Sequence, residues 1–439
     1  MNKLANVLVV ETRRERAAAI IDSLEKAGYA VTTAASTDEA EDFARTEHPD
    51  LVLVGAPADT QSLPAFASTL KRAASDIPTL LLVEEVTPAL CEDAMTLGLD
   101  DVLAYDCPEI EMLARLRPLV RLTVMHGELR RRAEAADHFG IIARDRVAGP
   151  GAERAAILVI GDEGDQIAAI LKSECDVAFC DTLYEAEEEL IRRNYDATVL
   201  SFRAAPDNLV GFCAQIRNNP RLFNLPILVR TDAPDGQLEW EADLYRRGAN
   251  RVLPFTVDSV LFRTALLTLV RRQQLRWTIR TALNDSLTDA TSDSETGAYS
   301  RSFLEIYLPV RLRLALASDR HLTVVFFSAP NIDDIRKQFG DDAARHLTRQ
   351  VRQWIAGLLR AEDIVARYAT YEFCVVLPDT PLAEAEIVMH RIAGVLAYTD
   401  FAVPDVYQPL KVWVQVGATD SQAGDDVATL MTRARRNMG

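Results

Sequence analysis

A short stretch near the C-terminus brings together an arginine and an aspartate that could bind a ligand. Residues 360–373 are RAEDIVARYATYEF, so Arg360 and Asp363 stand three positions apart, just before a predicted strand pair. A guanidinium donates and a carboxylate accepts hydrogen bonds, to a ligand or to each other. The turn between the strands, at 369–372, has neither glycines nor a pair of acids. The two side chains could therefore form a receptor site, or only a local ion pair worth about 0–1 kcal/mol.

The elements before this stretch follow a repeated pattern. Short apolar runs, as at 51–55 and 78–83, alternate with amphipathic stretches such as 14–26. Apolar strands of this length between helices are typical of parallel strands buried on both faces. The pattern returns from 155 to 255, as an internal repeat would. We therefore expect two related, doubly wound α/β domains with a helical linker between them, at the following positions: domains at 1–126 and 153–276, linker at 127–152.

The C-terminal third has a different pattern. A predicted helix at 301–317 leads into an apolar strand at 322–327, and a second helix spans 341–359. A strand pair then flanks the turn at 368–372. The remaining predicted elements are a helix at 382–397, a strand at 411–418 and a terminal helix. An antiparallel hairpin with helices outside it indicates an α+β domain. We place this domain at 293–439, after a second linker at 277–292.

Composition excludes several classes of function. The 439 residues carry a formal net charge of −17, which argues against broad binding to nucleic acids or membrane surfaces. No apolar run reaches the roughly 18–20 residues that would span a bilayer, and nothing resembles a signal peptide. The six cysteines and six histidines are dispersed, without metal-ligand spacing. We therefore expect a cytoplasmic protein without a metal site.

The two N-terminal domains resemble the receiver domains of response regulators, which act in two-component signal transduction. In that family an aspartate ending the third strand accepts a phosphoryl group, and a lysine ends the fifth strand. The corresponding residues here are Gly55 and Ser201 at the acceptor, and Tyr105 and Phe255 at the lysine. Glycine has no nucleophile, and a serine hydroxyl lacks the metal affinity of a carboxylate. The resemblance implies unphosphorylated packing and dimerisation modules. Two nearby acids are expected to be solvated loop residues: Asp59 and Asp207.

The C-terminal domain resembles the GGDEF domains, which are diguanylate cyclases. The stretch DSETGAYSR at 293–301 is similar to the opening D-x-L-T-G-L-x-N-R of that family. Residues 360–373 align without a gap with R-x-x-D-x-x-x-R-[YF]-G-G-[DE]-E-F. Each motif alone is weak, but both occur in register behind two receiver-like domains. This order is similar to the PleD-like receiver–receiver–GGDEF architecture.

The resemblance also implies that the cyclase reaction is lost. A cyclase of this family needs carboxylates on two Mg²⁺ ions, two glycines beside the triphosphate and acceptors for guanine. At each of these positions the required residue type is replaced in this sequence. Ser328 and Tyr371 stand where the family has the metal-binding acids, Ala369 and Thr370 where it has the glycines, and Arg336 and Lys337 where it has the guanine acceptors. Glu372 remains, but one acid makes no metal centre. We therefore expect no catalytic residue and no Mg²⁺ at this position.

In the GGDEF family the Arg-x-x-Asp pair is the inhibitory site for cyclic di-GMP. The resemblance implies that Arg360 offers its planar fork to guanine O6 and N7, while Asp363 accepts from N1–H and N2–H₂. Arg391, on the following helix, falls where the family places a second guanidinium. The expected function is a non-catalytic cyclic di-GMP effector. A residual cyclase and a nucleotide-independent scaffold remain as alternatives.

Related non-catalytic members of the family indicate a biological setting. The resemblance implies a homodimer formed through the receivers and ligand-dependent placement at a cell pole during the cell cycle. It also implies protein partners, namely other adaptors and a substrate delivered for proteolysis to an ATP-dependent protease. The run from Arg130 to Arg132 is expected to form a solvated helix face.

Overall fold

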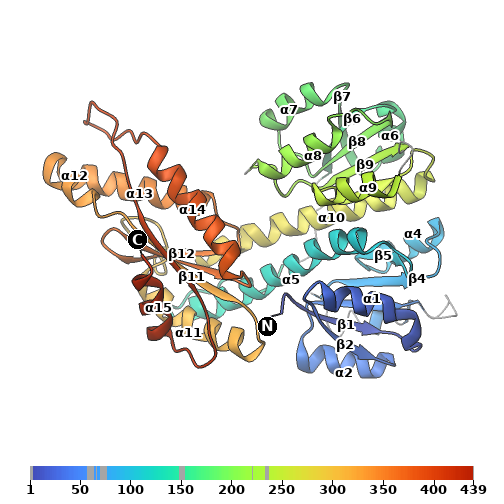
Figure 1. The fold of residues 1–439 in the computed structure, drawn as a ribbon, viewed down its shortest axis with the longest axis horizontal. Helices are drawn as coiled ribbons and strands as arrows, with labels where there is room; N and C mark the ends of the chain where they lie inside the picture. The colour runs from blue at the N-terminus through green and yellow to red at the C-terminus, as the bar shows by residue number, and fades with distance from the viewer. Residues whose placement is uncertain are drawn as a thin grey trace. The chain divides into compact units, whose positions relative to one another are not determined.

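The structure is a computed structural model, and it describes residues 3–56, 64–65, 67–69, 77–147, 154–219, 221–232 and 237–438 (Figure 1). The chain divides into two compact units, which are considered separately. The first contains the C-terminal domain together with two earlier segments: Met1–Leu4, Val124–Val147 and Ile279–Gly439. The second contains the two α/β domains: Ala5–Thr123 and Ala148–Thr278.

The first α/β domain is built on a parallel sheet of order β2-β1-β3-β4-β5. Its strands are β1 (Asn6–Val10), β2 (Ala30–Ala34), β3 (Leu51–Gly55), β4 (Thr79–Val83) and β5 (Asp101–Ala104). The helices are α1 (Arg14–Lys26), α2 (Thr37–Glu47), α4 (Pro88–Thr96) and the long α5 (Glu109–Asp137). The central strands are buried along almost their whole length, because helices cover both faces of a doubly wound sheet.

The second α/β domain repeats this topology, with the strand order β10-β9-β8-β6-β7. Its strands are β6 (Ala155–Gly161), β7 (Cys175–Cys180), β8 (Ala197–Ala204), β9 (Ile227–Asp232) and β10 (Arg251–Leu253). Its helices are α6 (Gly164–Leu171), α7 (Leu183–Arg192), α8 (Leu209–Asn218), α9 (Gln237–Arg246) and α10 (Ser259–Leu283). All the pairings within this sheet are parallel. The prediction of parallel α/β structure in the N-terminal part is confirmed.

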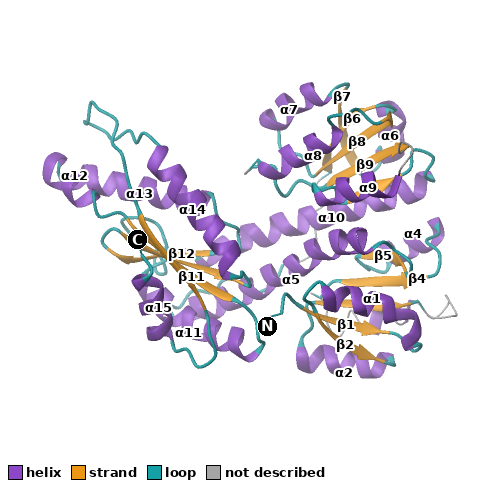
Figure 2. Cartoon of the chain, in the orientation of Figure 1, coloured by secondary structure: helices purple, strands orange, loops and turns teal. Residues whose placement is uncertain are grey.

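The C-terminal domain contains an antiparallel sheet of order β12-β13-β11-β14. Its strands are β11 (Leu322–Ser328), β12 (Ile364–Ala369), β13 (Glu372–Pro378) and β14 (Gln415–Asp420). Its helices are α11 (Arg301–Ala317), α12 (Ile332–Phe339), α13 (Asp341–Gly357), α14 (Leu382–Tyr398) and α15 (Val427–Arg436), and a short 3₁₀ turn at Asn284–Ser286 precedes them. Helices α11 and α15 pack on one face of the sheet, and α13 and α14 on the other (Figure 2). The helices therefore cover both faces of this sheet.

Two elements of this domain differ from the prediction. The last strand begins at Gln415 rather than at 411, because its neighbour β11 ends at Ser328, directly opposite Gln415. Helix α12 precedes α13 as a separate element. Gly340 stands between the two helices with a φ of 91°, in the left-handed region that glycine adopts easily.

Candidate functional site

The turn from Arg360 to Asp363 connects α13 to β12, and Asp363 closes it. The Asp363 carboxylate accepts a hydrogen bond of 2.8 Å from the Arg360 backbone N–H, and the Asp363 N–H donates to the Arg360 carbonyl at 3.2 Å. The Arg360 side chain is 41% exposed, and its Nη2 lies 3.8 Å from a carboxylate oxygen of Glu384. The three-residue spacing therefore makes a closed turn that carries an accessible guanidinium.

Arg391 contacts the same turn from α14. Its Nη2 donates a 3.0 Å hydrogen bond to the Leu358 carbonyl, two residues before Arg360. Glu384 and Arg391 are seven residues apart on α14, which is about two helical turns, so both face the same side. The three residues predicted to bind the ligand thus lie around one surface, formed by the end of α13, the turn and α14.

Arg132 supports the turn from beneath, and the sequence did not predict this role. It lies on α5 within the same compact unit, is only 3% exposed, and donates from Nη2 to the carbonyls of Ala361 and Asp363, at 3.0 Å each. The expectation of a solvated face is therefore wrong for Arg132. A signal was present: Leu129, Ala133 and Ala136 are buried on the same helix, and their spacing puts Arg132 on that stripe.

Glu372 holds the only carboxylate of the strand pair's turn, and an arginine already neutralises it. Glu372 begins β13 opposite Ser328 and is 7% exposed. Arg435, from α15, donates a 3.1 Å hydrogen bond from Nη2 to one carboxylate oxygen, and its Nε lies 2.7 Å from the other in an ion pair. A guanidinium this close to both oxygens competes directly with a metal ion for them.

The other positions compared with a cyclase centre also carry no free anion. Burial raises the pKa of Tyr371, which keeps its phenol neutral, and Arg336 lies beside it. Arg336 and Lys337 pair on their own helix with Asp333, at 3.0 and 2.9 Å. Ala369 is exposed beside the hairpin turn. Within the described residues, no group of three or more His, Cys, Asp or Glu side chains could hold a metal ion.

The opening motif of the domain is tied to the hairpin by Arg367. Asp293 accepts from the backbone N–H and the hydroxyl of Thr296, at 2.9 and 2.7 Å, and from Arg367 Nη1 at 3.0 Å. The other end of the same guanidinium donates to the Thr370 carbonyl at 3.0 Å. Burial opposes ionisation of Asp293, but these hydrogen bonds outweigh it and lower the pKa. Asp293, from the opening motif, and Arg367, from the second motif, therefore connect the start of the domain to the turn of the hairpin.

In the first α/β domain, a glutamate fills the space at the expected phosphoryl acceptor. Tyr105 donates a hydrogen bond to Glu11, which follows β1, and burial together with this bond raises the pKa of the Tyr105 phenol. A Cβ atom on Gly55 would lie 2.9 Å from the Glu11 carboxyl carbon and 2.7 Å from the Tyr105 hydroxyl. No larger side chain fits at position 55 while Glu11 and Tyr105 stay where they are.

In the second α/β domain, the expected acceptor is sealed inside the sheet. Ser201 is fully buried, and its hydroxyl has no hydrogen-bond partner in the part of the chain that the structure describes. Phe255, expected at the lysine position, contacts the guanidiniums of Arg203 and Arg230, each 4.2 Å from its ring centre. Glu163 pairs with both arginines, at 3.1 and 2.8 Å. The burial of Ser201 keeps its hydroxyl away from solvent in this structure.

The two nearby loop acids differ in how far they can be placed. Asp207 is exposed, in agreement with a solvated loop acid. Asp59 lies outside the described residues.

Comparison with known proteins defines the class of the C-terminal domain. Residues 290–439 match the family model described as "Diguanylate cyclase, GGDEF domain". The C-terminal part of the chain is thus similar to GGDEF domains. Nearly the whole chain is also similar to the response regulator PleD of Caulobacter vibrioides, with 25% identity covering 98% of this chain and 95% of PleD. This similarity supports an architecture of two receiver domains followed by a GGDEF domain.

Solved structures of GGDEF domains also match about a third of the chain. The GGDEF domain of DgcB from Caulobacter crescentus, in complex with c-di-GMP, is 17% identical and covers 34% of this chain and 85% of its own, with a TM-score of 0.33. The GGDEF domain of PA1120 from Pseudomonas aeruginosa is 26% identical, covers 33% and 84%, and has a TM-score of 0.31. Separately, none of the described helices is both long and apolar enough to cross a membrane.

Proposed function

We propose that this protein is a non-catalytic effector that binds cyclic di-GMP at Arg360, Asp363 and Arg391. The observation that carries the proposal is the closed turn of a GGDEF domain, with an accessible guanidinium and a second arginine on the adjacent helix. The turn is closed by its own hydrogen bonds, so binding would cost little ordering of the backbone.

The residue types suit a guanine base. The planar fork of Arg360 matches the O6 and N7 acceptors of guanine, and a carboxylate is the natural acceptor for the N1–H and N2–H₂ donors. Asp363 uses one oxygen to close its turn. Glu384, 3.8 Å from Arg360, would have to give up that weak contact when a base arrives.

Cyclase activity is not part of the proposal. The reaction needs two metal ions at carboxylates, and Ser328 and Tyr371 supply none. The remaining acid, Glu372, is held by Arg435. Because the ligand turn lies outside this group of residues, loss of catalysis leaves the receptor function intact.

The proposed output is recruitment of other proteins. Cyclic di-GMP would bind as an intercalated pair that bridges domains or subunits, and it would reorient receivers that form the homodimer. This combination resembles PopA, a polar cell-cycle adaptor related to PleD. By that resemblance, the partners are other adaptors and a substrate passed to an ATP-dependent protease.

Calorimetric titration with cyclic di-GMP tests the proposal directly. We expect saturable binding, weakened about 5- to 150-fold in Arg360→Ala, since a bidentate contact to guanine is worth about 1–3 kcal/mol. Arg345→Ala is the matched control, because Arg345 is an exposed arginine of α13 paired with Asp342. Absence of heat, or equal affinity in both variants, would favour a nucleotide-independent scaffold.

A further inference from the structure

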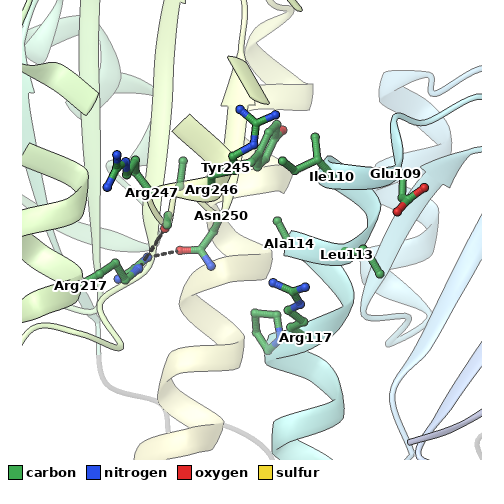
Figure 3. Close-up of a pocket in the computed structure, with 13 residues that line it drawn as sticks. Glu109, Ile110, Leu113, Ala114, Arg117, Arg217, Tyr245, Arg246, Arg247 and Asn250 are labelled. Atoms are coloured by element: carbon green, nitrogen blue, oxygen red, sulfur yellow. Dashed lines mark hydrogen bonds between the residues drawn. The ribbon is translucent and has the colours of Figure 1, made fainter. Parts of the chain in front are cut away.

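The compact unit of the two receiver-like domains contains a hollow of about 630 Å³ (Figure 3). Helix α5 forms one wall, and the second domain contributes Arg217 of α8, the end of α9 and the loop that follows it. This volume lies within the roughly 300–1,000 Å³ of small-molecule sites. Four of the described residues that line the hollow are arginines: Arg117, Arg217, Arg246 and Arg247. Glu109 is the only acidic residue in this lining.

Within the part of the chain that the structure describes, no carboxylate pairs with Arg217. Its guanidinium donates to the carbonyls of Gly248 and Leu225, at 3.0 and 2.7 Å, and to the side-chain oxygen of Asn250 at 2.8 Å. Burial lowers its pKa to about 10, so it remains protonated at neutral pH. These hydrogen bonds hold the loop at 248–250 in place and give the hollow a rigid basic wall.

The other three arginines are exposed around the hollow, and one of them, Arg117, also forms a side-chain hydrogen bond with Tyr29. Arg246 pairs with Asp243 on its own helix, at 2.9 Å. Among the residues that the structure describes, no carboxylate pairs with Arg117 or Arg247. Figure 3 places Glu109 on the opposite side of the view from Arg217. Unbalanced guanidiniums around one concave surface raise the local concentration of anions, even on a protein whose net charge is −17.

One side of the hollow is apolar. Ile110, Leu113, Ala114 and Pro118 of α5 line it, together with Tyr245 from α9. A bare inorganic anion would leave this wall unused, whereas a ligand with a planar or apolar body would cover it. Arginine forks match the oxygens of phosphate groups better than any other side chain.

We propose that this hollow binds a small ligand with at least two phosphate groups on a body of nucleoside size. Arg217 fixes the orientation of the basic wall, Arg117 and Arg247 contact the phosphates, and the α5 wall packs against the body. The site is distinct from the Arg360 turn, which belongs to the other compact unit. It does not depend on cyclic di-GMP binding.

The test is calorimetry on the full-length Arg360→Ala protein, in which the turn contributes little. GDP, GTP, ADP and sodium pyrophosphate are titrated in turn at low ionic strength. We expect saturable 1:1 binding of at least one nucleotide, with pyrophosphate at least tenfold weaker. Adding Arg117→Ala and Arg247→Ala together should weaken the nucleotide at least tenfold. Both side chains are exposed, so the fold should be kept, and circular dichroism checks this.

Arg192→Ala serves as the matched control. Arg192 is 71% exposed, pairs with Glu188 on α7 and does not line the hollow. Its affinity should stay within twofold of the parent. The proposal is overturned if no nucleotide gives saturable heat, or if the Arg117/Arg247 variant binds as tightly as the parent. Pyrophosphate binding as tight as the nucleotides would overturn the assigned nucleoside body.

Discussion

Arg132 is the residue through which α5 reaches the proposed ligand turn. Its guanidinium donates hydrogen bonds to two partly buried backbone carbonyls, which would lose this donor if Arg132 were replaced. We expect Arg132→Ala to destabilise the protein by about 1–3 kcal/mol, the usual cost of a buried polar group that loses its partner. Urea unfolding measures this, with Arg144→Ala as the control for an exposed arginine pair. An unfolding midpoint equal to that of the control would show that the two bonds contribute nothing.

The affinity for cyclic di-GMP provides a second test of the role of Arg132. Since the turn presents Arg360 only while its backbone is held, Arg132→Ala should also weaken cyclic di-GMP binding several-fold, without any direct contact to the ligand. The conservative Arg132→Lys variant should recover part of that loss, because an ammonium can still donate to one carbonyl.

Glu372 allows a direct test for residual catalysis. Because the Arg435 guanidinium forms an ion pair with Glu372, the carboxylate cannot also ligate a metal without disrupting that pair. Incubation of the pure protein with GTP and either Mg²⁺ or Mn²⁺ should give no cyclic di-GMP, as measured by liquid chromatography. Product above the level of Glu372→Ala would establish the protein as an enzyme.

Between elements, Asp101 joins the two receiver-like domains. It starts β5 and binds Arg115 of α5 at 2.6 Å and Arg272 of α10 at 2.9 Å. Burial opposes its ionisation, but the two guanidiniums outweigh burial and lower the pKa of Asp101 to about 2. The folded pKa lies below the unfolded value, so the stabilisation is complete above about pH 4 and is lost as the pH falls through about 2.

Removing this carboxylate should be costly. Asp101→Asn leaves the buried Arg272 without its counterion and leaves Arg115 paired with Glu111 alone; breaking a buried ion pair typically costs about 3–5 kcal/mol. Stability measured between pH 4 and 2 should fall in the wild type and change less in the variant. Asp176→Asn is the control, because its ion pair with Arg154 is exposed. A variant that keeps the wild-type pH dependence would contradict this assignment.

The regular elements were predictable because burial pattern and element type coincide in this chain. Parallel strands such as β3 and β4 are almost entirely apolar, and a glycine or turn signal bounds each helix of the first domain. The predicted start of the last strand at 411 was wrong for a reason outside its own sequence: its neighbour β11 ends opposite Gln415. Alternating apolar residues such as Leu410 and Val412 are buried there, but Leu410 forms only an isolated bridge with Phe401 and does not join the sheet. Strand pairing depends on two segments of the chain, whereas a hydrophobic pattern describes only one of them.

In the candidate site, too, local features could be predicted from the sequence, whereas contacts between distant segments could not. The spacing of Arg360 and Asp363 was visible in the sequence, since a turn is a local structure. The supports of that turn come from distant segments, with Arg132 lying 228 positions before Arg360. The hollow lined by Arg117 and Arg217 was not predicted either, because its walls come from two separate domains.

For the molecule as a whole, the proposal predicts a ligand-dependent position in the cell. If cyclic di-GMP binding places the protein at a pole, Arg360→Ala fused to a fluorescent protein should be diffuse, while Arg345→Ala should remain polar. Fluorescence microscopy at matched expression levels measures the polar fraction. Polar foci of equal intensity in both variants would separate localisation from the ligand turn.

The glutamate inside the first receiver-like domain has a consequence for timing. Because Gly55 has no nucleophile and the Glu11 carboxylate fills the space beside it, we predict that no kinase phosphorylates this domain and that no phosphatase acts on it. Under this prediction the domain would store no record of earlier phosphorylation. The duration of any response would then follow how fast the dinucleotide is made, degraded and released.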